Sequence, residues 1–575
     1  MKETMKNGKK LGESNTEQTM FIRINQLGYA SGLPVQIALL SDVASLDGIE
    51  ANTAKNSCNE SRLEKQTTLI LTDTAGNEVK KCTIGKPSYD EASGDCVRLV
   101  NIGVLPEGEY YIEFEGQKRE ISVKKDPWQK VTDALIKGLY YQRCGCELEE
   151  KYAGKFTHKA CHTAPAIEWD NREVKKTVIG GWHDAGDYGK YVGPGAVTVA
   201  HMIYAHMLCE KGCSDSLNIP ESGNGVPDIL NEARYELEWM LKMQRKDGAF
   251  YHKLTKAQFA PFIMPEDDHE QEYLMPVSHC ATGAACACLA LAYRVYKKYD
   301  AEFAEKLLSS ALLASKWIDD NPEFVPYTNP EGVRTGWYGD KNFADEQFWA
   351  ACELYASTGE SKYKDAAEKL YQDGLNITSY GWADVSGLGA ICCLFVLKDS
   401  AGDILYGSLK EKFIEECGKI AKLTEESGYG TALPADRYIW GSILSIMSNA
   451  ISLILHGMLT GDDKYRAAAL LQWNYALGLN ALDISFITGF GEKSVKNPHH
   501  RPSGADGIDE PVPGLISGGP NKCFPYQQNR ERFEGVPAAK CFLDETPSAD
   551  TNEIAIYWNS PAIFVGAYFA SECKQ

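Results

Sequence analysis

The chain has 575 residues, of which 44% are hydrophobic, and a formal net charge of −20 at pH 7. This length and hydrophobic content allow two domains with a large core and exclude a mostly disordered chain. The negative charge argues against nucleic acid or an anionic membrane as a partner, because both require basic patches. A neutral or cationic substrate suits the charge better.

Residues 1–20 are polar and lack the apolar core of a secretory signal, so we expect a disordered tail. We find no later run that is long and apolar enough to span a bilayer. The 18 cysteines follow no disulfide framework, and several, such as Cys286 and Cys392, lie in apolar helical surroundings. They predict reduced core thiols rather than disulfides. Together these features predict a cytoplasmic location, although a processed secreted protein would begin in the same way.

Residues 21–125 show the pattern of a small β-sandwich. Short β-branched or aromatic runs alternate with Gly, Asn and Asp turns, and they lie at residues 35–40, 68–71, 97–100 and 109–114. We therefore predict strands at these runs and a sandwich of about a hundred residues.

Residues 128–575 show helical periodicity instead. Apolar residues recur at spacings of three and four, which predicts amphipathic helices. The predicted helices lie near residues 130–143, 194–211, 227–243, 279–298, 301–319, 344–358, 361–372, 384–397, 404–421, 440–459, 463–478 and 560–572. Periodicity by itself establishes only an α-rich domain. The long Gly-rich segments at 480–555 are of the kind that usually carries functional residues.

The most distinctive motif lies at residues 180–191, which read Gly-Gly-Trp-His-Asp-Ala-Gly-Asp-Tyr-Gly-Lys-Tyr. Glycine allows the backbone to approach a ligand closely, and Asp184 and Asp187 can each accept a hydrogen bond from one water. One of the two could then act as a general base. The alternative interpretation is an Asp-Gly turn that caps a helix or binds a structural cation.

Two further segments have a similar character. Residues 485–491 read Ser-Phe-Ile-Thr-Gly-Phe-Gly and lead to Pro-His-His-Arg at 498–501, while residues 550–560 read Asp-Thr-Asn-Glu-Ile-Ala-Ile-Tyr-Trp-Asn-Ser. With the first motif they resemble the three hallmark regions of glycoside hydrolase family 9, the inverting β-glycanases. Val-Pro-Gly-Leu at 512–515, Gly-Gly-Pro-Asn at 518–521 and Ile-Asn-Gln-Leu-Gly-Tyr at 24–29 extend the resemblance.

The resemblance implies a mainly α fold, an (α/α)6 barrel at residues 128–575 that follows an immunoglobulin-like β-sandwich at 21–125. It also implies hydrolysis with inversion, which needs an acid and a base whose carboxyl groups lie about 6.5–9.5 Å apart. By resemblance Asp187 is the base, Asp184 helps to hold the water and Glu553 is the acid. The apolar neighbours of Glu553 would raise its pKa, whereas Asp187 beside glycines and Lys190 should stay ionised. Without the resemblance, Glu553 would be read as an ordinary helix N-terminal glutamate.

The substrate-binding residues also follow from the resemblance. His499 and Arg501 match positions that hydrogen-bond sugar hydroxyls, and we expect the neighbouring His500 to be exposed. Trp558 matches an aromatic under the −1 sugar, and Trp440 is a weaker candidate that could instead be core packing. The sequence departs from the family at Ala549, where an aromatic is usual, so an aromatic wall near the acid is in doubt.

Two metal sites are expected. Cys144, Cys161, His162 and His183 could form a closed tetrahedral zinc site with a structural role, as in some family members. Alternatively these are unconnected residues, and Cys146 is a competing neighbour. Asp345, Glu346 and Asp384 match a family calcium site, completed by backbone carbonyls at residues 338–340, although acidic residues also stabilise a helix N-terminus. We expect no organic cofactor.

The predicted function is hydrolysis of β-1,4-glucosidic bonds in soluble cello-oligosaccharides or β-glucans, by a cellodextrinase or endoglucanase. An alternative from the same family is an exo-β-D-glucosaminidase acting on chitosan oligosaccharides, since an acidic protein suits a cationic sugar. A third is a non-catalytic carbohydrate-binding protein, which the presence of both acid and base disfavours. Nucleic acid and membrane are not expected as partners, and the sequence leaves the oligomeric state open.

Overall fold

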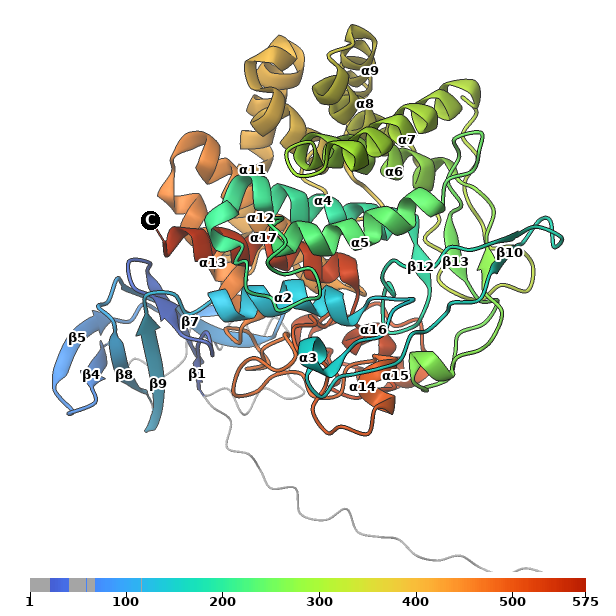
Figure 1. Cartoon of the computed structure of the whole chain (residues 1–575). Coiled ribbons are helices and arrows are strands. Elements are labelled where there is room, and N and C mark those ends of the chain that lie inside the picture. Colours follow the sequence, from blue (N-terminus) through green and yellow to red (C-terminus); the bar gives the residue numbers. More distant parts are fainter. Residues whose placement is uncertain (1–20, 41–57, 59–67, 115, 575) are drawn as a thin grey trace, which may run out of the picture.

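A computed structural model describes residues 21–40, 58, 68–114 and 116–574 (Figure 1). The tail predicted at residues 1–20 therefore lies outside the described residues. A β-rich part, blue in Figure 1, precedes a larger helical part that contains the rest of the chain.

The described residues of the N-terminal part form two sheets. The strand orders are β1-β3-β7-β6 and β2-β9-β8-β4-β5, and apolar side chains such as Ile37, Val100 and Ile112 are buried between them. The four runs predicted as strands are strands β3, β4, β7 and β8. The bounds are β1 Ile22–Arg23, β2 Tyr29–Ala30, β3 Val35–Leu40, β4 Thr68–Asp73, β5 Glu78–Thr83, β6 Ser88–Asp90, β7 Asp95–Gly103, β8 Gly108–Phe114 and β9 Gln117–Lys124.

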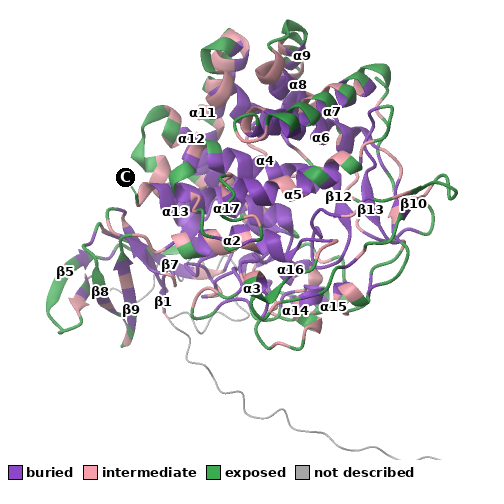
Figure 2. Cartoon of the chain, in the orientation of Figure 1, coloured by how far each residue is buried: buried purple, intermediate pink, exposed green. Residues whose placement is uncertain are grey.

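The helical part has an inner and an outer set of helices. Most residues of the inner set are buried, as Figure 2 shows for α4 and α17, so these helices are apolar around most of their circumference. The inner helices are α4 Val192–Cys209, α6 His279–Tyr296, α8 Ala344–Thr358, α10 Ser386–Ile391, α12 Ser442–Thr460 and α17 Ile556–Glu572. Helix α4 packs against α6 and α17, and α8 packs against α6 and α10.

Each outer helix packs its apolar face against an inner one. The pairs are α2–α17, α5–α4, α7–α6, α9–α8, α11–α12 and α13–α12. The outer bounds are α2 Gln129–Tyr141, α5 Asp228–Lys242, α7 Ala301–Asp320, α9 Ser361–Gln372, α11 Leu409–Glu426 and α13 Asp463–Ala476. All twelve predicted helices are thus found, but two begin or end in π-helical turns, at Cys392–Leu397 and Asp403–Ser408.

Short elements surround one end of the helices. A five-stranded sheet has the order β11-β10-β14-β13-β12, and its strand β12 consists of the last two residues of the motif at 180–191. The bounds are β10 Ala166–Glu168, β11 Lys175–Lys176, β12 Lys190–Tyr191, β13 Lys253–Thr255 and β14 Tyr273–Leu274, with short helices α3 Glu150–Ala153, α14 Arg501–Ala505, α15 Gln527–Arg532 and α16 Ala549–Asn552. The sequence patterns did not predict this sheet, because its strands are too short to show periodicity.

Two sequence expectations need correction. Val192–Gly212 and Ser442–Thr460 are long and apolar enough to span a membrane, with mean hydropathies of 1.2 and 1.6. They are packed inside the protein, since 83% and 61% of the two windows are buried, as in core helices. Cys58 and Cys96 form a disulfide, so these two are not reduced thiols, whereas the other cysteines among the described residues are free.

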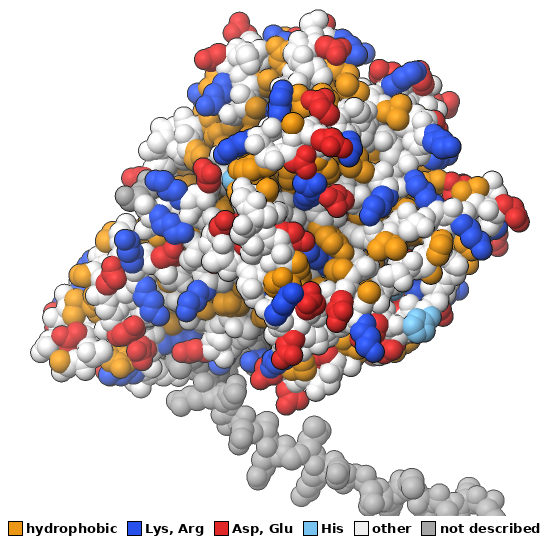
Figure 3. Space-filling view, viewed as in Figure 1, with side chains coloured by type: hydrophobic (Ala, Val, Ile, Leu, Met, Phe, Trp, Pro, Cys, Tyr) orange, Lys and Arg blue, Asp and Glu red, His pale blue; other side chains and the backbone are white. Residues whose placement is uncertain are grey.

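The surface is mixed in charge. On the face in Figure 3, Lys and Arg side chains lie between Asp and Glu side chains, and no continuous basic patch is visible there. This pattern agrees with the negative net charge of the whole chain.

A buried ion pair joins the β-rich part to the helical part. The Arg119 guanidinium lies 2.8 Å from Asp483 Oδ1 and donates to the Ile22 carbonyl oxygen, and both charged side chains are about 95% buried. Asn25 also donates to the Asn474 side chain across this boundary at 2.8 Å. The first part is therefore fixed to the second by directional contacts.

Removing Arg119 should leave the buried Asp483 carboxylate with only the half-exposed Lys493 ammonium, 3.7 Å from its Oδ2, as a counter-charge among the described residues. We predict that Arg119→Leu lowers the free energy of unfolding by about 3–5 kcal/mol, because a buried carboxylate loses its partner. The double variant Arg119→Leu/Asp483→Asn should recover part of that loss, since Asn tolerates the positive φ of 53° at this position. Urea denaturation measures both, with exposed Lys81→Ala as the control. Additive losses in the double variant would contradict this account.

Candidate active site

A cavity of about 940 Å³ opens where the short elements meet the helices. The structure brings all seven predicted catalytic and sugar-binding residues to its lining, although they come from distant parts of the sequence. They are Asp184, Asp187, Trp440, His499, Arg501, Glu553 and Trp558. The remaining lining is rich in aromatic rings, as is common in ligand pockets.

Backbone hydrogen bonds join the three motifs. Ile556 N–H donates to the Asp184 carbonyl oxygen at 2.8 Å, and Arg501 N–H donates to that of Gly186 at 3.1 Å. Gly186 has no room for a side chain, because a Cβ there would lie 1.9 Å from the His499 carbonyl oxygen. The small residues of the first motif thus allow the chain segments to approach closely.

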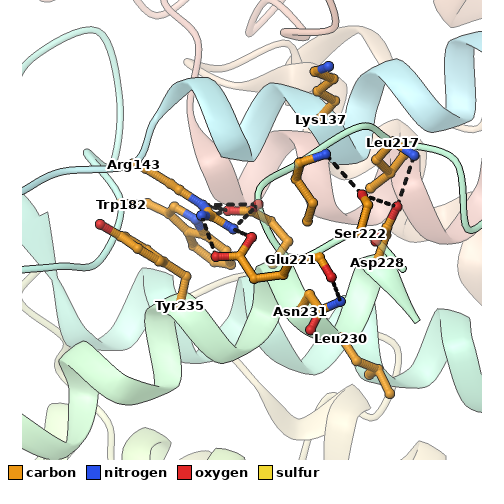
Figure 4. A network of polar contacts seen from close by, with 12 residues as sticks. Lys137, Arg143, Trp182, Leu217, Glu221, Ser222, Asp228, Leu230, Asn231 and Tyr235 are labelled. Atoms are coloured by element: carbon orange, nitrogen blue, oxygen red, sulfur yellow. Dashed lines mark hydrogen bonds and ion pairs between the residues drawn. The ribbon is translucent and has the colours of Figure 1, made fainter. Parts of the chain in front are cut away.

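A buried polar network includes Trp182 (Figure 4) and supports the segment that follows it, residues 184–187, which we call the catalytic turn. The Arg143 guanidinium donates to Glu232 and Glu221, and the Trp182 indole donates to Glu232 at 2.8 Å. Arg143 also pairs with Trp182 through a backbone bridge. Because Trp182 comes two residues before Asp184, this network fixes the start of the turn.

The two aspartates differ in their surroundings. Asp184 is 1% exposed, and the Tyr338 hydroxyl donates to its Oδ2 at 2.5 Å, while its Oδ1 has no partner among the described residues. Burial raises the pKa of the Asp184 carboxyl well above its usual range, and the Tyr338 hydrogen bond opposes that shift. Asp187 accepts from Gly189 N–H through Oδ1 at 2.7 Å. Both carboxylates can therefore present one oxygen to a water.

Glu553 lies between two helices rather than at a helix N-terminus. It has extended backbone angles, φ −67° and ψ 156°, after α16 and before α17, and its carbonyl accepts from Gly518 N–H. Burial raises the pKa of its carboxyl well above the usual range, the charges of Asp187 and Asp184 raise it further, and Arg501 and the indole of Trp440 lower it. Such a group keeps its proton in the pH range where an exposed glutamate would be ionised.

The histidines and arginine of the second motif have defined partners. His499 donates from Nδ1 to the Thr546 carbonyl oxygen at 2.7 Å, so its Nε2 is left as an acceptor. Arg501 donates to the carbonyl oxygens of Ala260 and Gly186, so it also holds the catalytic turn. The expectation that His500 is exposed is wrong, because it is 1% exposed and bonds Gln142 at 2.9 Å.

The two tryptophans occupy different depths. Trp558 is 3% exposed, and the glycines at 441 and 518 lie against its ring. Trp440 is 37% exposed and lines the cavity, so the core-packing interpretation of this residue is wrong.

Several residues that line the cavity lie outside the three motifs and were not predicted as site residues. Tyr338 contacts Asp184, and its φ of 45° is unusual outside glycine. Trp337 and Tyr526 are about half exposed within the lining. Trp337 and Tyr338 lie between the glycines at 336 and 339, and this pattern could have indicated that the two aromatic residues line a site. No comparable sequence pattern surrounds Tyr526.

The four predicted zinc ligands lie together beside the catalytic turn. Their ligand atoms are within 4.8 Å of one another, with Cys144 Sγ to His162 Nδ1 at 3.7 Å and His162 Nδ1 to His183 Nε2 at 3.4 Å. A tetrahedral zinc ion would require separations of about 3.3–3.8 Å. His162 Nε2 faces the Asp268 carboxylate at 3.3 Å, an arrangement that would orient the imidazole and leave its Nδ1 free to bind a metal. Cys146 is outside the cluster. The residues therefore form a possible metal site.

The predicted calcium ligands are only partly brought together. Asp340 and Glu346 form a cluster with Cys280, and Asp345 lies beside Glu346 in the first turn of α8. Asp340 Oδ2, Asp345 Oδ1 and Glu346 Oε2 are buried without a hydrogen-bond partner among the described residues. Asp384 bonds Ser386 through Oδ1 at 2.7 Å. Buried carboxylates of this kind need a cation or protons.

Known proteins resemble this chain over most of its length. The family description "Glycosyl hydrolase family 9" matches residues 128–566. The chain belongs to this family. It is 39% identical over 510 residues to a cellodextrinase of Butyrivibrio fibrisolvens, covering 84% of this chain and 92% of the relative.

Solved structures of this glycoside hydrolase family confirm the predicted fold. A single-mutant thermostable endoglucanase from Alicyclobacillus acidocaldarius has a TM-score of 0.87 at 30% identity, covering 96% of this chain and 99% of that one. A zinc-binding triple mutant of a family 9 endoglucanase has a TM-score of 0.86 at 27% identity, covering 94% and 99%. The chain is thus an (α/α)6-barrel hydrolase preceded by an immunoglobulin-like domain.

The contact between Trp440 and Glu553 predicts a pH effect. A general acid must be protonated, so kcat/KM falls as the pH rises through the pKa of Glu553. Trp440→Phe removes the indole N–H that lowers this pKa, so the alkaline limb of the pH profile should move to higher pH. The control is Trp337→Phe, whose indole donates to the Tyr327 carbonyl oxygen instead. A limb that stays in place or moves down would refute the contact.

Proposed function

We propose that the chain is an inverting hydrolase of the cellodextrinase kind, which cleaves β-1,4-glucosidic bonds in soluble cello-oligosaccharides. The observation that carries this proposal is the placement of Glu553 and the aspartate pair in one aromatic-lined cavity. The raised pKa of Glu553 favours its protonated form, and each aspartate can accept a hydrogen bond from a water. The related cellodextrinase and endoglucanases support the substrate class.

The proposed reaction needs only groups that line the cavity. Glu553 donates its proton to the glycosidic oxygen as the C1–O bond breaks. A water attacks C1 from the opposite face and passes its proton to Asp187, while Asp184 accepts the second hydrogen bond of that water. His499, Arg501, Trp440 and Trp558 orient the sugar rings.

The alternatives have less support. The glucosaminidase alternative finds no support in the compared proteins, whose names refer to cellodextrins or glucans. The carbohydrate-binding alternative does not explain why an acid with a raised pKa and an aspartate pair face the same cavity.

Removal of either proton-transfer group should reduce turnover without loss of the fold. We predict that Glu553→Gln and Asp187→Asn each lower kcat on cellotetraose by a factor of about 100 or more, because general acid–base groups contribute about 10²–10⁴-fold. Reducing-sugar release measures the rate, and thermal melting checks that the fold is intact.

The same assay with chitosan tetrasaccharide separates the two sugar classes. Wild-type enzyme should consume cellotetraose and leave the amino sugar. Near-normal rates in both variants would show that the roles are misassigned, and consumption of the amino sugar alone would restore the glucosaminidase alternative.

We also propose that Cys144, Cys161, His162 and His183 bind zinc. The donor set and spacing fit a tetrahedral ion, and Lys190 donates to Cys144 Sγ at 3.1 Å, which suits a thiolate. The ion would supply a fixed crosslink and no reactive position, because all four ligands come from the protein. His183 precedes Asp184, so the site would hold the catalytic turn in place.

Loss of one ligand should release the metal and loosen the turn. We predict that Cys161→Ser lowers the zinc content from one ion per chain to a small fraction and lowers the melting temperature. Elemental analysis and calorimetry measure these effects, and the exposed Cys523→Ser is the matched control. Purified wild-type protein with no zinc, and a variant that melts like it, would eliminate this site.

Calcium binding by Asp345, Glu346 and Asp384 remains part of the proposal. The calcium proposal is supported by the buried carboxylate oxygens of Asp345 and Glu346 that have no hydrogen-bond partner among the described residues. Asp340 contributes a third such oxygen. Burial raises the pKa of Asp345 to about 6, as expected for a carboxyl group that lacks a counter-ion in the protein itself.

A cytoplasmic location is likewise proposed. The free cysteines in the described part of the chain support it, whereas the Cys58–Cys96 disulfide is the feature that favours an oxidising compartment.

A further inference from the structure

One wall of the cavity comes from a segment that no motif predicted. Pro525, Tyr526, Gln527 and Gln528 all line the cavity, and we refer to them as the 525–528 wall. Their side chains are exposed, and the Tyr526 ring is 47% exposed although it is large and apolar. An exposed aromatic ring beside two carboxamides is a surface suited to a polyhydroxylated ring.

The wall lies on the side of the acid. The Tyr526 ring packs edge-to-face against Trp440, with ring centroids 6.1 Å apart, and Trp440 lines the cavity with Glu553 and lowers the pKa of the Glu553 carboxyl. Glu553 also raises the pKa of the Tyr526 hydroxyl, after the larger effect of burial. In the proposed reaction the water attacks from the face opposite the leaving group, so a wall next to the acid would lie against the leaving sugar.

The wall is held in place by its flanking residues. Lys522 N–H donates to the Tyr438 carbonyl oxygen at 2.7 Å, and the rings of Phe524 and Phe533 stack 5.2 Å apart. The buried Asn529, on the helix α15 that follows the wall, donates to the Asp550 carboxylate. Figure 1 shows α15 beside α16, the short helix before Glu553. The wall is thus fixed to the segments that carry both Trp440 and the acid.

Space for a ring remains in front of Tyr526. Ala549 also lines the cavity, and its methyl group fills little of it. Gln527 donates to the Glu531 carboxylate at 3.0 Å, which fixes the direction of its amide oxygen. The aromatic wall that Ala549 cannot supply near the acid is therefore supplied by Tyr526, from a different segment.

We propose that the 525–528 wall binds the leaving sugar, the ring that retains the glycosidic oxygen after cleavage, and that Tyr526 stacks on its face. This inference rests on the proposed function, because the acid that protonates the leaving oxygen must lie next to the sugar attached to it. Tyr526 then determines specificity for a β-1,4-linked sugar as leaving group, and Gln528 bonds a hydroxyl group of that sugar.

Two substrates separate the leaving-sugar contact from all other contacts. The leaving group of cellotetraose is a sugar. The leaving group of β-cellobiosyl fluoride is a fluoride ion, so this substrate places no sugar against the wall. Tyr526→Ala should lower kcat/KM on cellotetraose by about fivefold to tenfold and change that on the fluoride by less than about twofold. Gln528→Ala should lower the cellotetraose value by about threefold. Tyr526→Phe keeps the flat ring and should retain most of the activity.

Glu534→Ala, on the exposed loop after α15, is the matched control and should behave as wild type on both substrates. Equal losses on both substrates in Tyr526→Ala would indicate a structural role and overturn the proposal, as would unchanged kcat/KM on cellotetraose. Failure of the wild-type enzyme to hydrolyse either substrate would instead refute the proposed function. If every variant hydrolyses the fluoride, the enzyme is active, and a result on cellotetraose then tests the wall alone and not the proposed function.

Discussion

The close backbone contact at Gly186 is the constraint on which the site depends. Its carbonyl oxygen accepts from both the backbone and the side chain of Arg501, and the His499 carbonyl oxygen leaves no room for a Cβ. Ile556 N–H also donates a hydrogen bond to the Asp184 carbonyl oxygen. Together these contacts align the Asp184–Asp187 turn, the segment of His499 and Arg501, and the segment of Glu553. Three loops that are distant in sequence therefore act as one rigid surface, which a catalytic site requires.

Burial of charge explains how these loops stay in place and why they are reactive. Arg143 and Glu232 are almost fully buried behind the catalytic turn, where a paired charge fixes one geometry and an unpaired one would be costly. In front of the turn, Asp184 and Glu553 are desolvated and form no ion pair within the described part of the chain, so burial raises the pKa of each, although Arg501 partly opposes the shift of Glu553. Paired burial therefore stabilises the scaffold, and unpaired burial favours the protonated form of Glu553, as the proposed general acid requires.

The sequence predicted much of this because helices and hallmark motifs are local. The helix pattern predicted twelve helices that the structure contains, and the motifs singled out Asp187, Glu553 and the four Cys and His residues of the possible metal site. Three other features depend on tertiary contacts that no local pattern encodes: the burial of His500, the Cys58–Cys96 disulfide and the β10–β14 sheet. Tyr526 is the clearest case, since only the packing of its segment on Trp440 and Asp550 brings it to the acid.

The most direct test of the central claim is a proton NMR time course of cellotetraose hydrolysis by the purified protein, which follows the anomeric signals of the new reducing end. An acid and a base on opposite faces of the sugar predict that the α-anomer is released first and then mutarotates. Initial release of the β-anomer would show retention of configuration and contradict the roles given to Glu553 and Asp187. Absence of hydrolysis would contradict the proposed activity itself.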